Sequence, residues 1–436
     1  MKTTTHASTL GLVAGTLAAL VLVASPPAGR AAPARPAAAT GRPIEIPSGV
    51  QVELIGTWDV ARLDRIMTDE LVASGFSDQR ETRFGPARTA VRLYRMTYPS
   101  VIPEQHNRPT VASGLVAIPV EPLKPAPIVS YQHGTVFSKS EVPSSPEESM
   151  ETRLMVAQFA GQGYVVVAAD YFGKGRSPEG DSYLVEGSTQ QACVDMLFGA
   201  QSLLRQMGIE AGPLFLAGWS QGGWATLVLL QQLEALGAPV RAAATASAPT
   251  DIYTTVSRWI NNPQPIDTPW LTGVMAIEIG AQETYQLPGL VDVAIKPEYA
   301  QACRDLYANR IGWPEFSKQV PKLVRDMLRP EFVASSAQGE SDYWQRLQAE
   351  HGYRWRSHTP LRCYYGERDE VTPVYIATLP AGFQKIVGGG PTEAINAGAT
   401  ADHRGTFLFA VADQKKWFDG MLAVKTAAVP PQPAVP

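Results

Sequence analysis

Cysteine, clustered charge and long apolar runs are all scarce in this chain. Three cysteines allow at most one internal disulfide bond and leave one thiol over, and the sequence does not say which pair, if any, forms. The net charge is −4 at pH 7, with no block of five or more like charges, which argues against a nucleic-acid partner. Beyond the N-terminal region no apolar run reaches the about 20 residues that span a bilayer, so we expect no stable membrane insertion. The cysteines are Cys193, Cys303 and Cys363.

An export signal is predicted at the N-terminus. A basic start at Lys2 precedes an apolar run at about residues 10–24, and small residues and prolines follow through Ala39. Cleavage would fit after Ala31 or after Ala39, and the former removes Lys2 and Arg30, which takes the net charge from −4 to −6. We therefore expect a secreted or periplasmic protein. The alternative is a retained amphipathic anchor.

Short apolar strands alternate with longer helical patterns between about residues 88 and 420. This rhythm predicts an α/β fold with a mostly parallel central sheet and helices on both faces. The apolar runs at 128–131 and 165–169 lack strict alternation, as central strands covered on both faces should. The expected strands are 89–97, 112–120, 127–132, 164–169, 213–217, 242–246, 360–365 and 383–387.

Helix starts are also predicted from local signals. Ser145 with Glu148 has the spacing of a capping box, and Ser188 with Gln191 repeats it at the start of a helix that runs to about residue 207. A last helix is expected at 406–418. The first two helices lie where a crossover between parallel strands needs one.

The strand rhythm breaks between residues 249 and 357. This stretch holds five of the nine tryptophans and has no convincing strand, so we expect a helical cap insertion over the site. The alternative is a second packing layer that only adds core. The predicted organisation is a leader at 1–39, a first core part at 40–248, the cap insertion at 249–357, a second core part at 358–428 and a flexible tail at 429–436. The tryptophans of the insertion are Trp259, Trp270, Trp313, Trp344 and Trp355.

The most informative motif is Gly-Trp-Ser-Gln-Gly-Gly at 218–223. It follows the apolar run at 213–217 and precedes a helical stretch at 224–233, which is the strand, sharp turn and helix that present a nucleophilic serine in G-x-S-x-G motifs. In so tight a turn, a side chain two residues on either side of Ser220 would collide with the neighbouring strand or helix. We therefore predict Ser220 as a nucleophile at the carboxyl edge of the sheet.

A serine hydroxyl needs a histidine to take its proton and a carboxylate to orient that histidine. His403 is the best candidate because it lies after the last expected strand and just before a helix. Asp369 follows the expected strand at 360–365, and the order Ser220, Asp369, His403 is one of the known orders of such triads. Other acids remain alternatives, namely Glu367, Glu370, Asp402 and Asp251.

An oxyanion intermediate needs two or more N–H donors. One is expected from Gln221, at the start of a helix where N–H groups are free. The second is expected from Gly134 or Thr135, in the loop after the strand at 127–132, and the Thr135 hydroxyl could add to it. A plain turn from strand to loop is the alternative for this segment.

Together these motifs resemble the α/β-hydrolase superfamily over roughly residues 88–420. The resemblance is carried by HGT at 133–135, DYFGKG at 170–175, GWSQGG at 218–223, GERDEVTP at 366–373 and the late His403. Its finer features are similar to esterases and lipases of the secretory-lipase type. The resemblance implies the triad and oxyanion donors named above. It also implies substrate contacts from three residues of these motifs, His133, Tyr171 and Trp219, the last standing where Tyr or His is more usual.

The leading hypothesis is an exported serine hydrolase that cleaves a small-molecule or lipid ester without a metal or an organic cofactor. The tryptophans of the insertion favour an apolar acyl or aryl group. A serine exopeptidase of the same fold is an alternative, in which Glu278 or Glu283 of the cap insertion would anchor an amine. A non-catalytic binding protein is a third hypothesis, but it would be expected to have lost a member of the triad.

Overall fold

The computed structural model describes residues 44–46, 49–76 and 82–423, which belong to one compact unit that begins at Ala39. The predicted leader at 1–39 and tail at 429–436 lie outside these residues. None of the described helices combines the length and the apolar character that crossing a bilayer requires.

A single sheet of ten strands organises the part of the chain that the structure describes. The strand order is β1-β2-β3-β4-β6-β5-β7-β8-β9-β10. Strands β1 to β4 pair antiparallel with their neighbours, including β4 with β6, whereas β6, β5, β7, β8, β9 and β10 pair parallel. In the parallel half, the carboxyl ends of β5, β7 and β9 therefore lie at one edge of the sheet, as the sequence predicted. The strands are β1 Ile44–Ile46, β2 Val50–Trp58, β3 Val91–Ile102, β4 Arg108–Pro119, β5 Ala126–Gln132, β6 Val165–Ala169, β7 Ala211–Trp219, β8 Ala242–Ala246, β9 Leu361–Tyr365 and β10 Thr392–Asn396.

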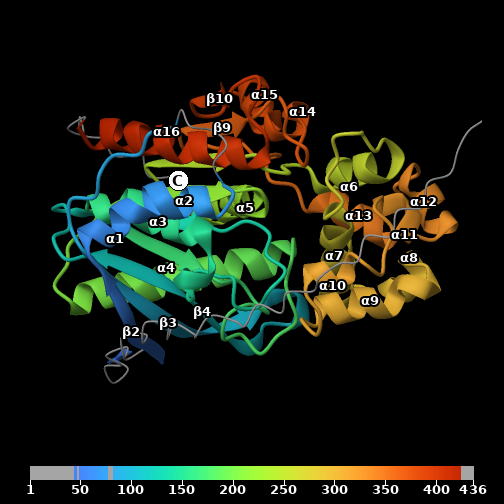
Figure 1. Cartoon of the computed structure of the whole chain (residues 1–436), viewed down its shortest axis with the longest axis horizontal. Helices are drawn as coiled ribbons and strands as arrows, with labels where there is room; N and C mark the ends of the chain where they lie inside the picture. The colour runs from blue at the N-terminus through green and yellow to red at the C-terminus, as the bar shows by residue number, and fades with distance from the viewer. Residues whose placement is uncertain (1–43, 47–48, 77–81, 424–436) are drawn as a thin grey trace, which may run out of the picture. The chain divides into compact units, whose positions relative to one another are not determined.

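Helices cover both faces of this sheet (Figure 1). Helices α4, Glu186–Gln206, and α5, Gln221–Ala235, pack on one face, while α1, Val60–Arg65, α3, Met150–Phe159, and α16, His403–Ala423, pack on the other. Every residue of β5, β6 and β8 is buried, as expected of strands covered on both sides. Successive residues of one strand therefore enter different cores: Ile128 packs with the α4 and α5 face, and Val129 with the α3 and α16 face.

The insertion between β8 and β9 is helical, with no strand among its described residues. Its helices gather together beyond one end of the sheet and are coloured yellow to orange in Figure 1. Their apolar side chains continue the core of the α4 and α5 face without a break. At the return to the sheet, the indole N–H of Trp224 in α5 donates to the carbonyl of Glu350. The helices are α6 Ile252–Asn261, α7 Leu271–Tyr285, α8 Leu290–Ala294, α9 Pro297–Tyr307, α10 Trp313–Phe316, α11 Val324–Met327, α12 Pro330–Ser336 and α13 Asp342–Ala349.

The expected strand at 383–387 is wrong. These residues form the second half of helix α15, Leu379–Val387, which follows the short helix α14, Val374–Ala377. Pro380 lies in the first turn of α15, and Gly388 ends it with a φ of 63°, which is the usual proline and glycine asymmetry of a helix. The last strand is instead β10, whose side chains are half-buried or exposed, so no apolar run marked it.

Two predicted helix caps are also wrong. Ser145 precedes a 3-10 turn, Pro146–Glu148, and the cap of α3 is Ser149, whose hydroxyl accepts from the Thr152 N–H. Helix α4 begins at Glu186, before Ser188, whose hydroxyl donates to Glu104. At α3 the next serine along the chain supplies the cap, and at α4 the Ser188 hydroxyl is bound to a side chain elsewhere in the fold.

The three cysteines are buried and free, so none of the possible disulfide bonds forms. Burial raises the pKa of all three thiols, which keeps them protonated and unreactive. They therefore act as small apolar core residues.

Candidate active site

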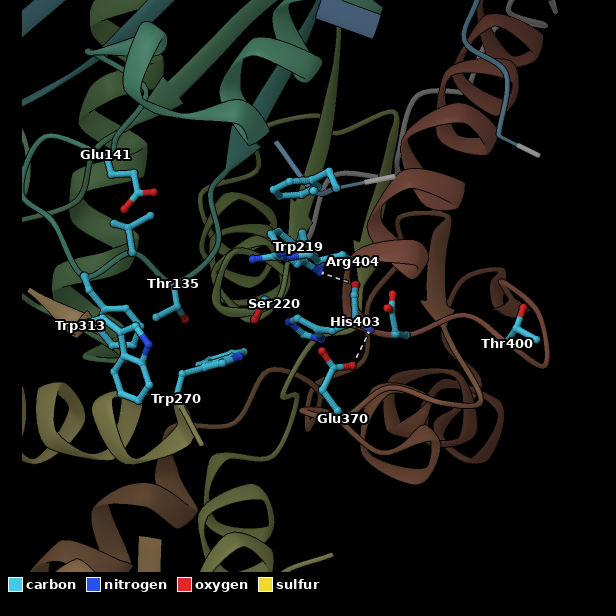
Figure 2. A pocket seen from close by; sticks show the side chains of 15 residues that line it. Thr135, Glu141, Trp219, Ser220, Trp270, Trp313, Glu370, Thr400, His403 and Arg404 are labelled. Atoms are coloured by element: carbon cyan, nitrogen blue, oxygen red, sulfur yellow. Dashed lines mark hydrogen bonds between the residues drawn. The ribbon is translucent and has the colours of Figure 1, made fainter. Parts of the chain in front are cut away.

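Ser220 occupies the sharp turn between β7 and α5. Its φ of 57° and ψ of −124° are strained for a residue with a side chain, and such strain persists only where the surroundings enforce it. A Cβ atom on Gly218 would collide with the carbonyl oxygen of Gly222, and one on Gly222 would collide with that of Gln132 in β5. The two glycines therefore allow the turn that lifts the Ser220 hydroxyl into a cavity (Figure 2).

His403 and Asp369 lie side by side at the same edge. His403 is the first residue of α16, and Asp369 lies in the turn after β9. The Nδ1 atom of His403 lies 2.9 Å from Oδ1 and 3.1 Å from Oδ2 of Asp369, and as the hydrogen-bond donor it leaves Nε2 with a free lone pair. That Nε2 has no hydrogen-bond partner among the residues described. The ring is therefore oriented as a general base requires.

The Asp369 carboxylate is held by more than the histidine. Its Oδ1 accepts the N–H groups of Val371, at 2.9 Å, and Thr372, at 2.8 Å. Burial alone would raise the pKa of Asp369, but the charge and hydrogen bond of His403 and the Thr372 N–H outweigh it and lower that pKa. Burial alone would lower the pKa of His403, but the Asp369 carboxylate outweighs it and raises that pKa. Each group thus favours the charged form of the other.

Ser220 and His403 line the same cavity, and Figure 2 shows the Ser220 hydroxyl between Thr135 and the His403 ring. No hydrogen bond joins the serine to the histidine, which is common before a substrate tightens such a site. The histidine ring is held between two indoles: its centroid lies 5.0 Å from that of Trp219 and 6.3 Å from that of Trp270. The Trp219 N–H also donates to the His403 carbonyl at 3.1 Å.

The other acids have different partners. Glu370 accepts the backbone N–H of His403 at 3.0 Å, and Asp402 accepts that of Gly405 at 2.7 Å, so both belong to the start of α16. Glu367 accepts from the Asn396 side chain, and Asp251 caps α6 through the Thr254 N–H. Of the acids considered from the sequence, Asp369 is the one hydrogen-bonded to the His403 ring.

The predicted oxyanion donors fare differently. Gln221 begins α5, so its N–H has no acceptor one turn earlier in the helix. Thr135 lines the cavity beside Ser220, and its hydroxyl lies 2.7 Å from that of Tyr183. Gly134 is a correction, because its N–H already donates to Oε1 of Glu151 at 2.8 Å. Of the two loop residues predicted as donors, Thr135 therefore stays a candidate, whereas the Gly134 N–H is bound to Glu151.

The predicted substrate contacts of His133 and Tyr171 differ from that of Trp219, because neither residue belongs to the lining of the main cavity beside Ser220. Both are buried, and their rings stack with centroids 4.3 Å apart. The ring nitrogens of His133 contact the carbonyls of Gly134, at 2.8 Å, and Asp170, at 3.2 Å. The Tyr171 hydroxyl donates to the His133 carbonyl at 3.1 Å. These two side chains pack beneath the loop that follows β5, whereas Trp219 lines the main cavity.

Glu151 was not among the residues that the sequence analysis singled out. It lies in the first turn of α3, where an acid usually faces solvent, but here it is buried beneath the loop after β5. Its Oε1 accepts both the Gly134 N–H and the Tyr131 hydroxyl. Burial, only partly offset by these hydrogen bonds, raises the pKa of Glu151 to about 7. Only the tertiary packing of α3 against β5 reveals this contact.

The main cavity has a volume of about 840 Å³ and is lined by aromatic and charged side chains. Phe76, also unpredicted, contributes a ring edge-to-face with Trp219, with centroids 6.0 Å apart, and the Arg404 guanidinium lies 5.0 Å from the centre of the Phe76 ring. Trp270 and Trp313 enter the lining from the cap insertion. The insertion thus contributes directly to the candidate site.

The cap acids proposed as amine anchors do not reach this cavity. Glu278 is buried within α7, where its Oε2 accepts the Tyr343 hydroxyl at 2.6 Å. Glu283 accepts the Val291 N–H at 3.0 Å. Both carboxylates are engaged inside the cap insertion.

Comparisons with known proteins bear on this geometry. Residues 150–270 match the Prolyl oligopeptidase family. The sequence has no match among curated proteins. A presumed hydrolase from Legionella pneumophila is similar in structure, with a TM-score of 0.77 and 22% identity, over 89% of this chain and 100% of that one.

Two further solved structures are similar. The ligand-bound rice cell wall degrading esterase LipA from Xanthomonas oryzae has a TM-score of 0.71 and 19% identity, over 87% of this chain and 96% of that one. Candida antarctica lipase A in its closed state has a TM-score of 0.57 and 17% identity, over 80% of this chain and 77% of that one. The family match and these neighbours support a hydrolase, and the chain has the α/β-hydrolase fold.

Proposed function

We propose that this protein is a serine hydrolase that cleaves carboxylic esters. The observation that carries the proposal is the His403 ring: it donates from Nδ1 to Asp369, its Nε2 has no hydrogen-bond partner among the described residues, and the residue lines the same cavity as Ser220. A buried base oriented by a carboxylate next to a strained serine is the arrangement that activates a hydroxyl nucleophile.

In the proposed mechanism, Ser220 Oγ attacks the ester carbonyl carbon while His403 Nε2 takes the hydroxyl proton. The tetrahedral intermediate then collapses, the bond to the alcohol oxygen breaks, and His403 returns the proton to that oxygen. Water attacks the resulting acyl-enzyme in the same way, with its proton passing through His403 to Ser220 as the acid leaves. Asp369 stays ionised throughout and stabilises the imidazolium.

The negative charge of the intermediate would be stabilised by the N–H groups of Gln221 and Thr135. Gln221 adds the positive end of the α5 dipole, and the loop that carries Thr135 is tied to α3 by the bond between Gly134 and Glu151. Donors preorganised in this way stabilise the transition state without having to reorient. The Gly134 N–H takes no part, because it is bound to Glu151.

The substrate is proposed to be a small-molecule or lipid ester with apolar or aromatic parts. Support comes from Trp219, Trp270 and Trp313, which line the main cavity beside the nucleophile. We also propose that the protein acts after export, on the basis of its N-terminal pattern. N-terminal sequencing of the mature protein should then begin at residue 32 or 40, and a mature chain starting at Met1 would count against export.

A serine peptidase is the second candidate, favoured by the match of residues 150–270 to the Prolyl oligopeptidase family. A peptide substrate bound by its amino terminus would need an acidic residue to anchor that charged terminus. Glu278 and Glu283 are engaged elsewhere, so an acid of the main cavity such as Glu141 would have to serve. Ester substrates require no such anchor, which is why we place the esterase first.

The test compares nitrophenyl esters of increasing chain length with aminoacyl anilides, using wild type and Ser220→Ala. We expect ester hydrolysis that the substitution abolishes while the circular dichroism spectrum stays unchanged. Hydrolysis of anilides alone would replace the esterase by the peptidase. Absence of both activities in a folded protein would favour the binding-protein hypothesis.

A further inference from the structure

A second, narrow cavity opens from Ser220 in the direction of the cap insertion. Three residues line both this cavity and the main one: Thr135, Ser220 and Trp270. Its volume is about 10 Å³, against about 840 Å³ for the main cavity. On this scale it has room for about one water molecule, which is also roughly the size of a methyl group. The nucleophile therefore stands at the junction of a very small and a large space.

The narrow cavity is apolar. None of its lining residues carries a charge, and its walls include Ile252, Val256 and Trp259 of α6 and Val274 of α7. Apart from the Ser220 hydroxyl, the side-chain hydroxyl groups in its walls are already engaged. The Thr255 hydroxyl donates to the Asp251 carbonyl at 2.7 Å, and the Tyr183 and Thr135 hydroxyls lie 2.7 Å apart. A polar substituent placed here would lose its hydrogen bonds to water without finding new ones.

The walls are also well packed. Ile252, Val256, Trp259 and Val274 are each no more than 5% exposed. The Trp259 indole additionally donates to the Val371 carbonyl, which also belongs to the lining, at 3.4 Å. A close-packed wall of this kind resists expansion, and extra methylene groups forced into such a space are costly.

The position of His403 decides which part of an ester enters which cavity. The alcohol oxygen must lie near His403 Nε2, because that atom returns the proton to it. His403 lines the main cavity and is absent from the lining of the narrow one. Figure 2 shows its ring on the side of Ser220 opposite Thr135. The leaving alcohol therefore occupies the main cavity, and the acyl chain is left with the narrow one.

We propose that the narrow cavity is the acyl subsite and that it selects acetyl esters of bulky alcohols. The inference rests on the proposed ester hydrolysis and adds the substrate class. The acetyl methyl group fills the apolar space between α6 and α7. The alcohol is received by the aromatic and charged side chains of the main cavity, among them Trp313, Glu141 and Arg404.

The test uses nitrophenyl acetate, propionate, butyrate, hexanoate and octanoate, so that the leaving group stays constant. In wild type, kcat/KM should be highest for acetate and fall about tenfold or more by butyrate, as overpacking predicts. Val256→Ala and Val274→Ala each remove bulk from the wall and should move the optimum to propionate or butyrate. Two variants on different helices guard against one that fails to fold.

The matched control is Val291→Ala. Val291 is a buried valine of α8 in the cap insertion, and it lines neither cavity. It should keep the acetate optimum, because it shares only the general loss of packing with the two test variants. A control that shifted the optimum as far as they do would overturn the assignment of this cavity.

Other outcomes separate the inference from the proposed function. Hydrolysis that depends on Ser220 but is fastest for octanoate, or is indifferent to chain length, overturns the acetyl subsite and leaves the esterase intact. An acetate optimum that neither wall variant moves overturns the subsite as well. If folded wild type hydrolyses none of the esters, the proposed function fails and the subsite falls with it.

Discussion

The Glu151 carboxylate accepts the backbone N–H of Gly134 across 2.8 Å and so ties helix α3 to the loop that follows β5. Gly134 itself has little room: a Cβ atom there would lie 3.1 Å from the Trp219 indole and 3.3 Å from Glu151. The next residue, Thr135, is the proposed oxyanion donor. We therefore expect Glu151 to be a positioning residue, which would act on the proposed intermediate through the loop.

Glu151→Ala should lower kcat by about tenfold or more while changing KM little. The substitution leaves the buried Gly134 N–H unpaired, which costs ~1–3 kcal/mol, and the loop can satisfy it only by moving. Glu151→Gln retains an oxygen that can accept this bond, so its kcat should lie between wild type and the alanine variant. Steady-state kinetics on nitrophenyl acetate checks the order. A kcat of Glu151→Ala within twofold of wild type would remove the positioning role.

The pH profile should report the coupling of His403 and Asp369. Because the pKa of His403 is raised, the imidazolium persists above the ordinary value of 6.5, and the neutral base appears only at higher pH. The acid limb of kcat/KM should therefore lie above pH 6.5. Asp369→Asn removes the charge that raises this pKa, so burial should then bring the limb to lower pH.

The same variant should lose activity by roughly 10³–10⁴-fold, since the histidine is no longer held in the required tautomer. Profiles of kcat/KM against pH, measured for wild type and Asp369→Asn, check both effects. A wild-type limb at or below pH 6.5 would show that Asp369 does not raise the pKa of the catalytic base.

Glu278 should make the stability of the protein depend on pH. Burial raises the pKa of Glu278 from 4.5 to about 8, with the Tyr343 hydroxyl bond only partly opposing it. Between about pH 4.5 and 8, the Glu278 carboxyl therefore holds a proton in the folded state that it releases in the unfolded chain. Its stabilising effect is complete below about pH 4.5 and is lost as the pH rises through about 8.

Glu278→Gln replaces the titratable carboxyl group by a neutral amide without changing the shape of the side chain. Relative to wild type, its Tm should rise progressively between pH 5 and 9. Glu298→Gln, at an exposed site in α9 of the same insertion, is the control and should run parallel to wild type. Parallel curves for Glu278→Gln and wild type would mean that Glu278 is ionised in the folded protein.

Gly222→Ala should destabilise the protein by about 1–3 kcal/mol or more and abolish activity. Its Cβ atom would collide with the Gln132 carbonyl oxygen, a backbone atom of β5 that cannot move without distorting the sheet. Gly382→Ala is the matched control, because a Cβ atom there meets nothing within 4 Å. Urea unfolding measures both, and equal stability of the two variants would disprove the steric account of the turn.

The sequence was most informative where a local steric rule determines structure. The Gly218 to Gly222 turn, the apolar runs of β5 and β8 and the chain order of Ser220, Asp369 and His403 needed no knowledge of distant contacts. The run at 383–387 failed because a short apolar stretch is compatible with both strand and helix, and the surrounding Pro380 and Gly388 decide for the helix.

Where the structure differs from the predicted site, the difference depends on the direction of a side chain and on tertiary packing. Whether His133 points into a cavity or beneath a loop depends on its stacking with Tyr171, 38 residues later in the chain. Whether Gly134 has a free N–H depends on Glu151, which the sequence makes look like a surface acid. Neither contact leaves a mark in the pattern of residues.

The helices between β8 and β9 share one uninterrupted core with α4 and α5, and Trp224 reaches from α5 to the carbonyl of Glu350. Replacing residues 249–357 by the insertion of a relative would therefore expose apolar side chains of α5. To transfer the specificity of this insertion, the residues of α5 that face it must be exchanged together with it. In evolution, the two segments would be expected to change together.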